Sequence, residues 1–98
     1  MEKMIYKTLR YSRHAIERMF QRGISPEVIE CVILVGEIIA DYPDDTPYPS
    51  SLILGVYNDQ PIHVVLSSGT LTDECTIITV YKPDPAFWDA TFRIRRSQ

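Results

Sequence analysis

The sequence is poor in the residues that staple small scaffolds or span membranes. Two cysteines among 98 residues, Cys31 and Cys75, cannot form a disulfide framework, and their apolar surroundings are typical of free thiols in a reducing compartment. The longest apolar stretch, residues 28–40, contains Glu30 and Glu37 and is too short to cross a bilayer. The first residues lack the apolar core of a secretory signal. We therefore expect a cytoplasmic protein without a membrane segment.

Length and composition predict a single domain. With 98 residues, of which 45% are hydrophobic and 23% charged, the chain has room for one hydrophobic core. A chain of this size buries roughly 60–70% of its unfolded surface, which is enough to fold without staples. We assign residues 1–98 to one domain.

The charge is unevenly distributed. The net charge of −3 argues against a dedicated nucleic-acid-binding protein. Residues 1–22, however, carry six basic and two acidic side chains, whereas residues 23–92 carry one lysine and eleven acids. If both ends of the chain share one face, they form a basic pole that can meet phosphates; the alternative is a solvated helix face and a separate tail. The predicted phosphate-binding residues are Arg13, Arg22, Arg93 and Arg95.

Two helices are predicted near the N-terminus. Ser12 is a good N-cap and Gly23 a good C-terminal residue for the first, with His14, Arg18 and Arg22 on a side away from its apolar stripe. That stripe comprises Ala15, Ile16, Met19 and Phe20.

Ser25-Pro26-Glu27 starts the second helix, which Gly36 ends. Its apolar residues predict burial, although their β-branched side chains also allow a strand. Both Gly23 and Gly36 are expected in the left-handed conformation.

The remaining sequence predicts strands. Four β-like segments are separated by turn-forming residues, and Pro83 and Pro85 end the last one. They are residues 37–42, 51–58, 62–67 and 75–82. We therefore predict an α+β fold in which two N-terminal helices pack on a four-stranded, mainly antiparallel sheet, with residues 86–98 left as a helical turn or a strand. The expected core is Ile16, Phe20, Val28, Val32, Ile53, Val64 and Ile78.

Side chains suited to acid–base chemistry are few. An imidazole is a candidate proton carrier, and His14 stands one helical turn from the anion-binding guanidinium of Arg18. Strand alternation puts His63 on one face of its strand and Tyr81, with Thr79, on one face of the next. The alternatives are a surface residue for His14 and a half-buried strand residue for His63. The spacing of possible ligands predicts no metal site, and no cofactor motif is present.

The motif His14-Ala15-Ile16-Glu17-Arg18-Met19-x-x-Arg22-Gly23-Ile24-Ser25 resembles the opening of the bacterial domain-of-unknown-function family 4258 (DUF4258). The resemblance extends over residues 11–85, through Gly36-Glu37, Leu54-Gly55, the segment 61–65 and the segment 78–81. It implies a fold order similar to that of RelE/ParE-type toxins, whose relatives include ribonucleases that cleave messenger RNA without a metal ion. It also implies a small zinc-finger antitoxin-like protein as a partner.

From this resemblance we expect a RelE-like ribonuclease or a degenerate relative. Its catalytic residues would be His14, Arg18, His63 and Tyr81, with His63 or His14 as the base that deprotonates a ribose 2′-hydroxyl. The alternative is a non-catalytic interaction module that binds an antitoxin-like partner or forms a homodimer. In that module His14 and Arg18 form an ion-pair network with Glu37.

Overall fold

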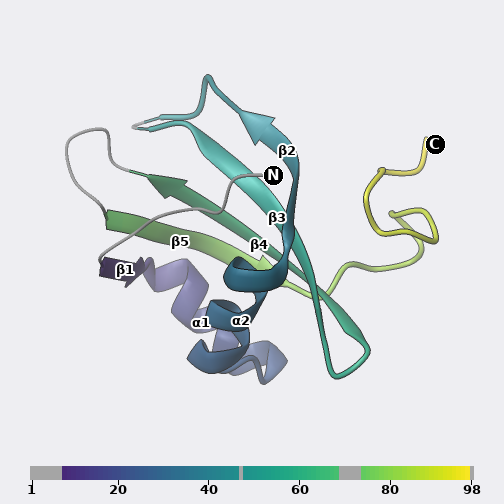
Figure 1. The fold of residues 1–98 in the computed structure, drawn as a ribbon, viewed down its shortest axis with the longest axis horizontal. Helices are drawn as coiled ribbons and strands as arrows, with labels where there is room; N and C mark the ends of the chain where they lie inside the picture. Colours follow the sequence, from purple (N-terminus) through teal and green to yellow (C-terminus); the bar gives the residue numbers. More distant parts are fainter. Residues whose placement is uncertain (1–7, 47, 69–73, 98) are drawn as a thin grey trace.

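The computed structural model describes residues 8–46, 48–68 and 74–97 (Figure 1). Within these residues, two helices and five strands follow one another. They are β1 (Thr8–Tyr11), α1 (Arg13–Arg22), α2 (Pro26–Val35), β2 (Glu37–Tyr42), β3 (Ser50–Tyr57), β4 (Gln60–Ser68) and β5 (Glu74–Tyr81). The α+β class, both helices and all four predicted strands are confirmed. Most of the predicted loop before β5 lies outside the described residues.

The sheet has one more strand than predicted. Its order is β1-β5-β4-β3-β2, in which β2 to β5 form the predicted antiparallel meander. β1 precedes the helices and pairs in parallel with β5, from Thr8 beside Glu74 to Tyr11 beside Ile77. The prediction of four strands preceded only by helices was therefore wrong. Four residues carry too little periodicity to reveal a strand that exists through its pairing with the far end of the chain.

The helix boundaries follow the predicted capping residues. The Ser12 hydroxyl accepts a hydrogen bond from the backbone N–H of Ala15, and Gly23 ends α1 in the left-handed region at φ 64°. Ser25 caps α2, and Pro26 is its first residue. The left-handed conformation expected for Gly36 was wrong, because this glycine is extended, with φ −78° and ψ 178°. β2 begins at the next residue, so the chain leaves α2 directly in strand geometry.

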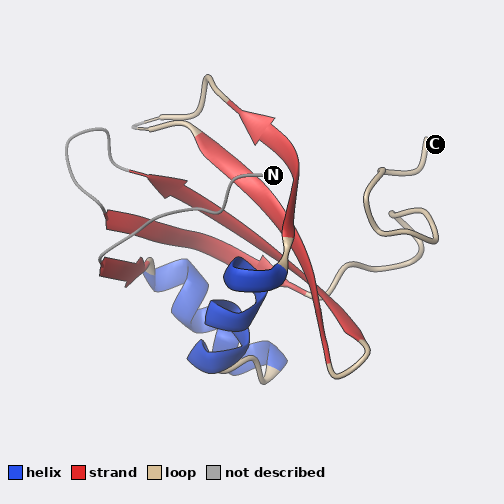
Figure 2. Cartoon of the chain, in the orientation of Figure 1, coloured by secondary structure: helices blue, strands red, loops and turns tan. Residues whose placement is uncertain are grey.

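Both helices pack on one face of the sheet, as Figure 2 shows, with α1 against β5 and α2 against β3 and β4. Val32, Ile53 and Val64 are buried there, as predicted. Val28 and Ile78 are partly buried.

Ile16 and Phe20, by contrast, are 45% and 85% exposed, so their predicted burial was wrong. The small Ala15 is fully buried and Met19 packs against the core, so α1 is turned with the other edge of its apolar stripe toward the sheet.

A β-bulge changes the alternation of β5. Val65 pairs with Thr79 and Leu66 with Ile77, so Ile78 has no direct partner on β4. Ile77 and Val80 are consequently both buried, although they are three positions apart and would lie on opposite faces of a regular strand. The bulge leaves Thr79 and Tyr81 on the face opposite to the helices, beside Val65 and His63. The strand faces on which alternation places His63 and Tyr81 therefore coincide.

Residues 82–97, here called the C-terminal segment, lie over the sheet face opposite to the helices (Figure 1). The segment forms neither a helix nor a regular strand, and an isolated antiparallel bridge joins Trp88 to Arg95. The Trp88 ring packs against the His63 ring at 4.5 Å between centroids. The Arg93 guanidinium pairs with the Glu37 carboxylate of β2. The segment is thus attached to the sheet at its middle and at one edge strand.

Candidate functional site

α1 separates two hollows of different chemistry. One side of the helix, with His14, Arg18 and Arg22, lines a pocket of about 420 Å³ that we call the cationic pocket. Another side, with Ile16 and Phe20, lines a hollow of about 400 Å³ that we call the apolar groove. The cationic side and the apolar side of α1, which the helical spacing distinguishes in the sequence, therefore line two separate hollows.

Three elements far apart in the sequence build the cationic pocket. α1 forms one wall, the end of β5 contributes Thr79 and Tyr81, and the C-terminal segment forms the opposite wall. The segment's lining residues are Lys82, Asp84, Phe87, Trp88 and Arg95. The lining thus contains four cationic side chains and a single carboxylate, together with the aromatic rings of Tyr81, Phe87 and Trp88. Such a surface attracts anions even though the whole protein is acidic.

The position of α1 beside β5 is fixed by Ser12. Its backbone N–H donates to the Ile77 carbonyl at 3.0 Å, and its hydroxyl donates to the Ile78 carbonyl at 2.9 Å. The same hydroxyl caps the helix. Because His14 follows two residues later, these bonds place the start of α1 next to the strand that carries Thr79 and Tyr81.

His14 and Arg18 are paired along α1. Arg18 Nε donates to His14 Nε2 at 3.5 Å, and Arg18 Nη1 donates to the Gln21 side-chain oxygen at 3.1 Å. In this arrangement His14 Nε2 is an acceptor whose lone pair is occupied by the Arg18 N–H, so His14 can act as a general base once that bond is released. The guanidinium keeps further N–H groups for an anion.

His63 lies behind the pocket and does not line it. The side chain is fully buried, and its Nε2 lies 2.8 Å from the Phe92 carbonyl, to which it must donate. Its Nδ1 therefore accepts from the Tyr81 hydroxyl at 3.2 Å. Burial lowers the pKa of His63, against the opposing effect of the Phe92 carbonyl, and burial also raises the pKa of Tyr81. Both groups hold their neutral forms, with His63 orienting Tyr81.

Of the residues predicted from the sequence, the pocket brings together five: His14, Arg18, Arg22, Tyr81 and Arg95. Arg13 is exposed on α1 but is not among the lining residues.

Arg93 also lies outside the lining, because it is paired with Glu37. This pairing raises the pKa of Arg93 and lowers that of Glu37. Glu37 thus bonds to Arg93 in place of the network predicted with His14 and Arg18.

Sequence reasoning identified only Arg95 on the wall formed by the C-terminal segment. Lys82, Phe87 and Trp88 line the pocket because the chain turns after β5 and returns over the sheet. Pro83 and Pro85 indicate that the strand ends, but they do not indicate where the chain goes next. A tryptophan beside a phenylalanine in a basic tail was the available signal.

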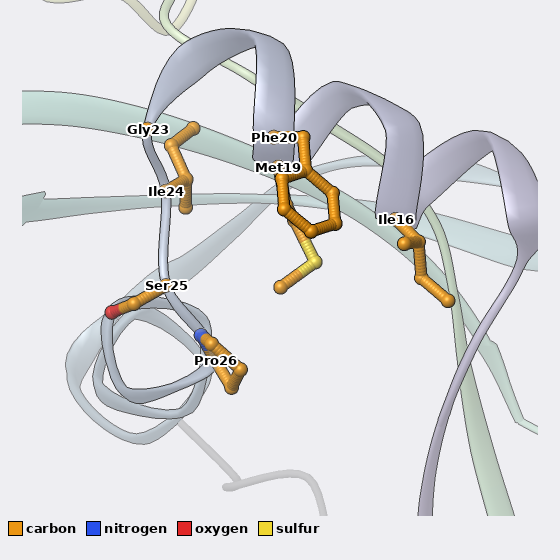
Figure 3. A pocket seen from close by; sticks show the side chains of 7 residues that line it. All are labelled: Ile16, Met19, Phe20, Gly23, Ile24, Ser25 and Pro26. Carbon is orange, nitrogen blue, oxygen red and sulfur yellow. The ribbon is translucent and has the colours of Figure 1, made fainter.

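The apolar groove lies between α1 and the start of α2. Figure 3 shows the side chains of Ile16, Met19 and Phe20 on one side of α1, with Pro26 across from them. Gly23, Ile24 and Ser25 connect the two walls. An 85% exposed phenylalanine beside such a hollow is a feature of surfaces that bind apolar groups.

Within residues 8–46, 48–68 and 74–97, no three His, Cys, Asp or Glu side chains gather as metal ligands. Neither helix in this part of the chain is long and apolar enough to cross a membrane.

Comparison with known proteins places most of this architecture in one family. The family model described as "Domain of unknown function (DUF4258)" matches residues 11–82, from the end of β1 to the residue after β5. No curated protein and no solved structure matches the chain. The matched region holds the α1 and β5 sides of the cationic pocket, whereas the aromatic wall follows it.

Proposed function

The chain belongs to the DUF4258 family, and we propose that it is a RelE-like ribonuclease whose cationic pocket binds and cleaves the phosphodiester backbone of RNA. The observation that carries this proposal is the convergence of His14, Arg18, Arg22 and Tyr81 in one pocket, although α1 and β5 are far apart in the sequence. A proton acceptor, anion-binding groups and a phenol are the components that phosphodiester cleavage requires.

The arginines supply binding. Arg18 and Arg22 lie one turn apart on the pocket side of α1, and Arg95 reaches the same space from the C-terminal segment. Guanidinium groups bind phosphate oxygens through paired N–H donors, and they stabilise the negative charge that develops on the phosphorus substituents. The eleven acids of residues 23–92 keep the overall affinity modest.

His14 and Tyr81 supply the proton transfers. Arg18 Nε turns from His14 Nε2 to the phosphate, which frees the lone pair of that nitrogen. The ribose 2′-oxygen then attacks phosphorus and loses its proton to His14 Nε2. The bond from phosphorus to the 5′-oxygen breaks, and that oxygen takes the phenolic proton of Tyr81, whose hydroxyl turns away from His63. The products are a 2′,3′-cyclic phosphate and a 5′-hydroxyl. His14 then releases its proton to water, and Tyr81 recovers one from water.

The chemistry of the thiols supports a cytoplasmic location. Cys31 and Cys75 are not joined in a disulfide, and a reducing compartment keeps cysteines as thiols. RNA is available in the same compartment.

A labelled single-stranded RNA tests the proposal by fluorescence anisotropy and by gel analysis of cleavage. At about 50 mM salt or below, where the Debye length exceeds about 10 Å, the purified protein should bind and cut it. R18A/R22A should weaken binding and reduce the salt dependence by one to two phosphate contacts, whereas R13A on the same helix should not. H14A should abolish cleavage and leave the salt dependence unchanged. Absence of binding at low salt would overturn the proposal.

A second candidate function is the docking of a small protein partner in the apolar groove, favoured by the exposure of Phe20. Exposed Glu17 and Glu27 directly follow Ile16 and Pro26 in the chain, so each of the two helices carries a carboxylate next in sequence to a residue that lines the groove. A two-fold dimer through this groove would bring like charges together, which argues for a separate partner. We propose a partner with an apolar anchor beside basic side chains, such as a zinc-finger antitoxin-like protein.

An amphipathic peptide with leucines on one face and lysines on the other is the probe for this candidate. Its affinity should fall on F20A and stay unchanged on F87A, whose ring lies at the other pocket. Light scattering that shows a dimer of the pure protein, dissociated by F20A, would instead assign the groove to a second copy and overturn the partner proposal.

A further inference from the structure

We infer that the cationic pocket selects single-stranded RNA by stacking one unpaired nucleobase on the ring of Phe87, an inference that rests on the proposed RNA-binding function. Phe87 lines the pocket together with Arg18 and Arg22 of α1 and with Arg95. Bases and phosphates alternate along a nucleic-acid strand, so a site that binds both needs cations and an aromatic face close together. The pocket has both.

The two neighbouring aromatic residues differ in exposure. Trp88 is 7% exposed because it packs against His63, where it holds the C-terminal segment to the sheet. Phe87 remains 49% exposed although it is adjacent in sequence. The fold therefore uses Trp88 for packing, and the ring of Phe87 stays accessible to a ligand.

The backbone that carries Phe87 is fixed by hydrogen bonds on both sides. The Phe87 N–H donates to the Asp84 carbonyl at 2.9 Å, and its carbonyl accepts from the Arg96 N–H at 2.8 Å. The Arg96 side chain also donates to the carbonyls of Pro85 and Trp88, at 2.8 and 3.0 Å. A ring displayed on a braced turn loses little conformational freedom when a ligand stacks on it.

Arg95 places a positive charge over one face of this ring, so a base would stack on the other face. Its guanidinium carbon lies 5.8 Å from the ring centroid of Phe87 and 5.7 Å from that of Trp88. A base stacked on Phe87 would thus have its own phosphate near a cation, and guanidinium planes themselves stack on bases. The pocket volume of about 420 Å³ falls within the range of small-ligand sites.

The same geometry discriminates against duplexes. In a helix each base is stacked on its neighbours and paired, so its face is not available to a protein ring. An unpaired base can rotate out of the strand and stack on the ring. Each stacked base contributes about 1–3 kcal/mol to the binding free energy, which corresponds to roughly five-fold to a hundred-fold in affinity. The preference should depend on Phe87 and be independent of the base sequence.

The test compares three labelled probes by anisotropy at about 50 mM salt: a short single-stranded RNA, the same strand annealed to its complement, and inorganic polyphosphate, which has charge but no bases. F87A should raise the Kd for the single strand about five-fold to a hundred-fold and leave that for polyphosphate unchanged. F87L keeps apolar bulk without a π-face and should behave as F87A, whereas F87W should bind normally. F20A removes an exposed phenylalanine at the apolar groove and serves as the control, so its Kd for each probe should equal that of the wild type.

The outcomes separate the two proposals. Equal binding of all probes by R18A/R22A and wild type would overturn the RNA-binding function itself. The stacking inference is wrong, and the RNA-binding function stands, if R18A/R22A binds RNA weakly but F87A binds it as the wild type does. The same conclusion follows if F87A loses affinity for polyphosphate and RNA alike. Equal affinity for single-stranded and duplex RNA also contradicts the inference. Circular dichroism and the fluorescence of the single tryptophan, Trp88, check that each variant is folded.

Discussion

The imidazole of His63 accepts a hydrogen bond from the Tyr81 hydroxyl and donates one to the carbonyl of Phe92. A fully buried side chain thus connects β5, which contributes to the floor of the cationic pocket, with the segment that forms its wall. Neither bond requires a charged imidazole. The arrangement depends on the neutral form with its proton on Nε2.

Stability should therefore depend on pH through His63. Its pKa is lowered in the folded protein from the ordinary value of 6.5, so the unfolded chain binds a proton more readily. The contribution of neutral His63 to the unfolding free energy is complete above pH 6.5 and is lost as the pH falls toward the lowered pKa of the folded protein. Urea denaturation should give a smaller unfolding free energy at pH 5.5 than at pH 7.5, and H63Q should show a smaller difference. An equal difference in H63Q would assign the effect to other groups.

Ser12→Ala should destabilise the protein more than Ser25→Ala. Both serines cap helices, but only Ser12 also donates to a strand carbonyl, that of Ile78. Loss of a cap costs about 1 kcal/mol, and loss of the strand bond adds about 1 kcal/mol. Thermal denaturation of the two variants measures the difference. Equal melting temperatures would show that the bond to β5 contributes nothing.

Gly55→Ala should separate α2 from β3. A methyl group there would lie 2.9 Å from Cγ1 and 3.0 Å from Cα of Val32, too close for packed carbon atoms. We expect a loss of about 1–3 kcal/mol from overpacking. In a double-mutant cycle Val32→Ala should cost less in the Gly55→Ala background than in the wild type, because it relieves part of the clash. Additive effects would contradict the close contact.

Gly23→Ala should also destabilise, for a different reason. No atom surrounds the added methyl group, but the backbone is left-handed at φ 64°, which costs a residue other than glycine about 1–2 kcal/mol. Gly23→Asn should recover much of this loss, since asparagine tolerates that conformation. Chemical denaturation of the two variants compares them. An asparagine variant as unstable as the alanine variant would argue against a purely conformational effect.

Phe20→Ala should leave stability almost unchanged. The ring is 85% exposed, so its removal creates no cavity, and surface substitutions usually change the unfolding free energy by less than about 0.5 kcal/mol. Denaturant titration checks this. A loss of about 3 kcal/mol or more, as expected for a buried phenylalanine, would place the ring in the core.

The local part of the fold was predictable because local chemistry determines it. Ser12 and Ser25 cap the helices and Gly23 ends α1, as capping preferences require. The orientation of α1 was not predictable, because the apolar stripe is wider than the face that β5 covers. Only tertiary packing decides that Ala15 is buried while Phe20 is exposed.

The candidate site was predictable on one side only. The helical spacing of His14, Arg18 and Arg22 shows that they share a surface, and strand alternation places Tyr81 with His63. Nothing in the sequence shows that the C-terminal segment folds back opposite α1. That contact depends on long-range bonds, such as the one from His63 to Phe92.

The parallel pairing of β1 with β5 affects the order in which the molecule assembles. Ser12 and Ile78, which bond beside this pairing, are 66 positions apart, and closing so long a loop is entropically costly. Contacts between such distant residues form slowly, and during synthesis they can form only after β5, the last of the five strands, has been made. A growing chain that has not reached residue 74 already contains α1 with its arginines, but it lacks β5, the strand against which α1 packs.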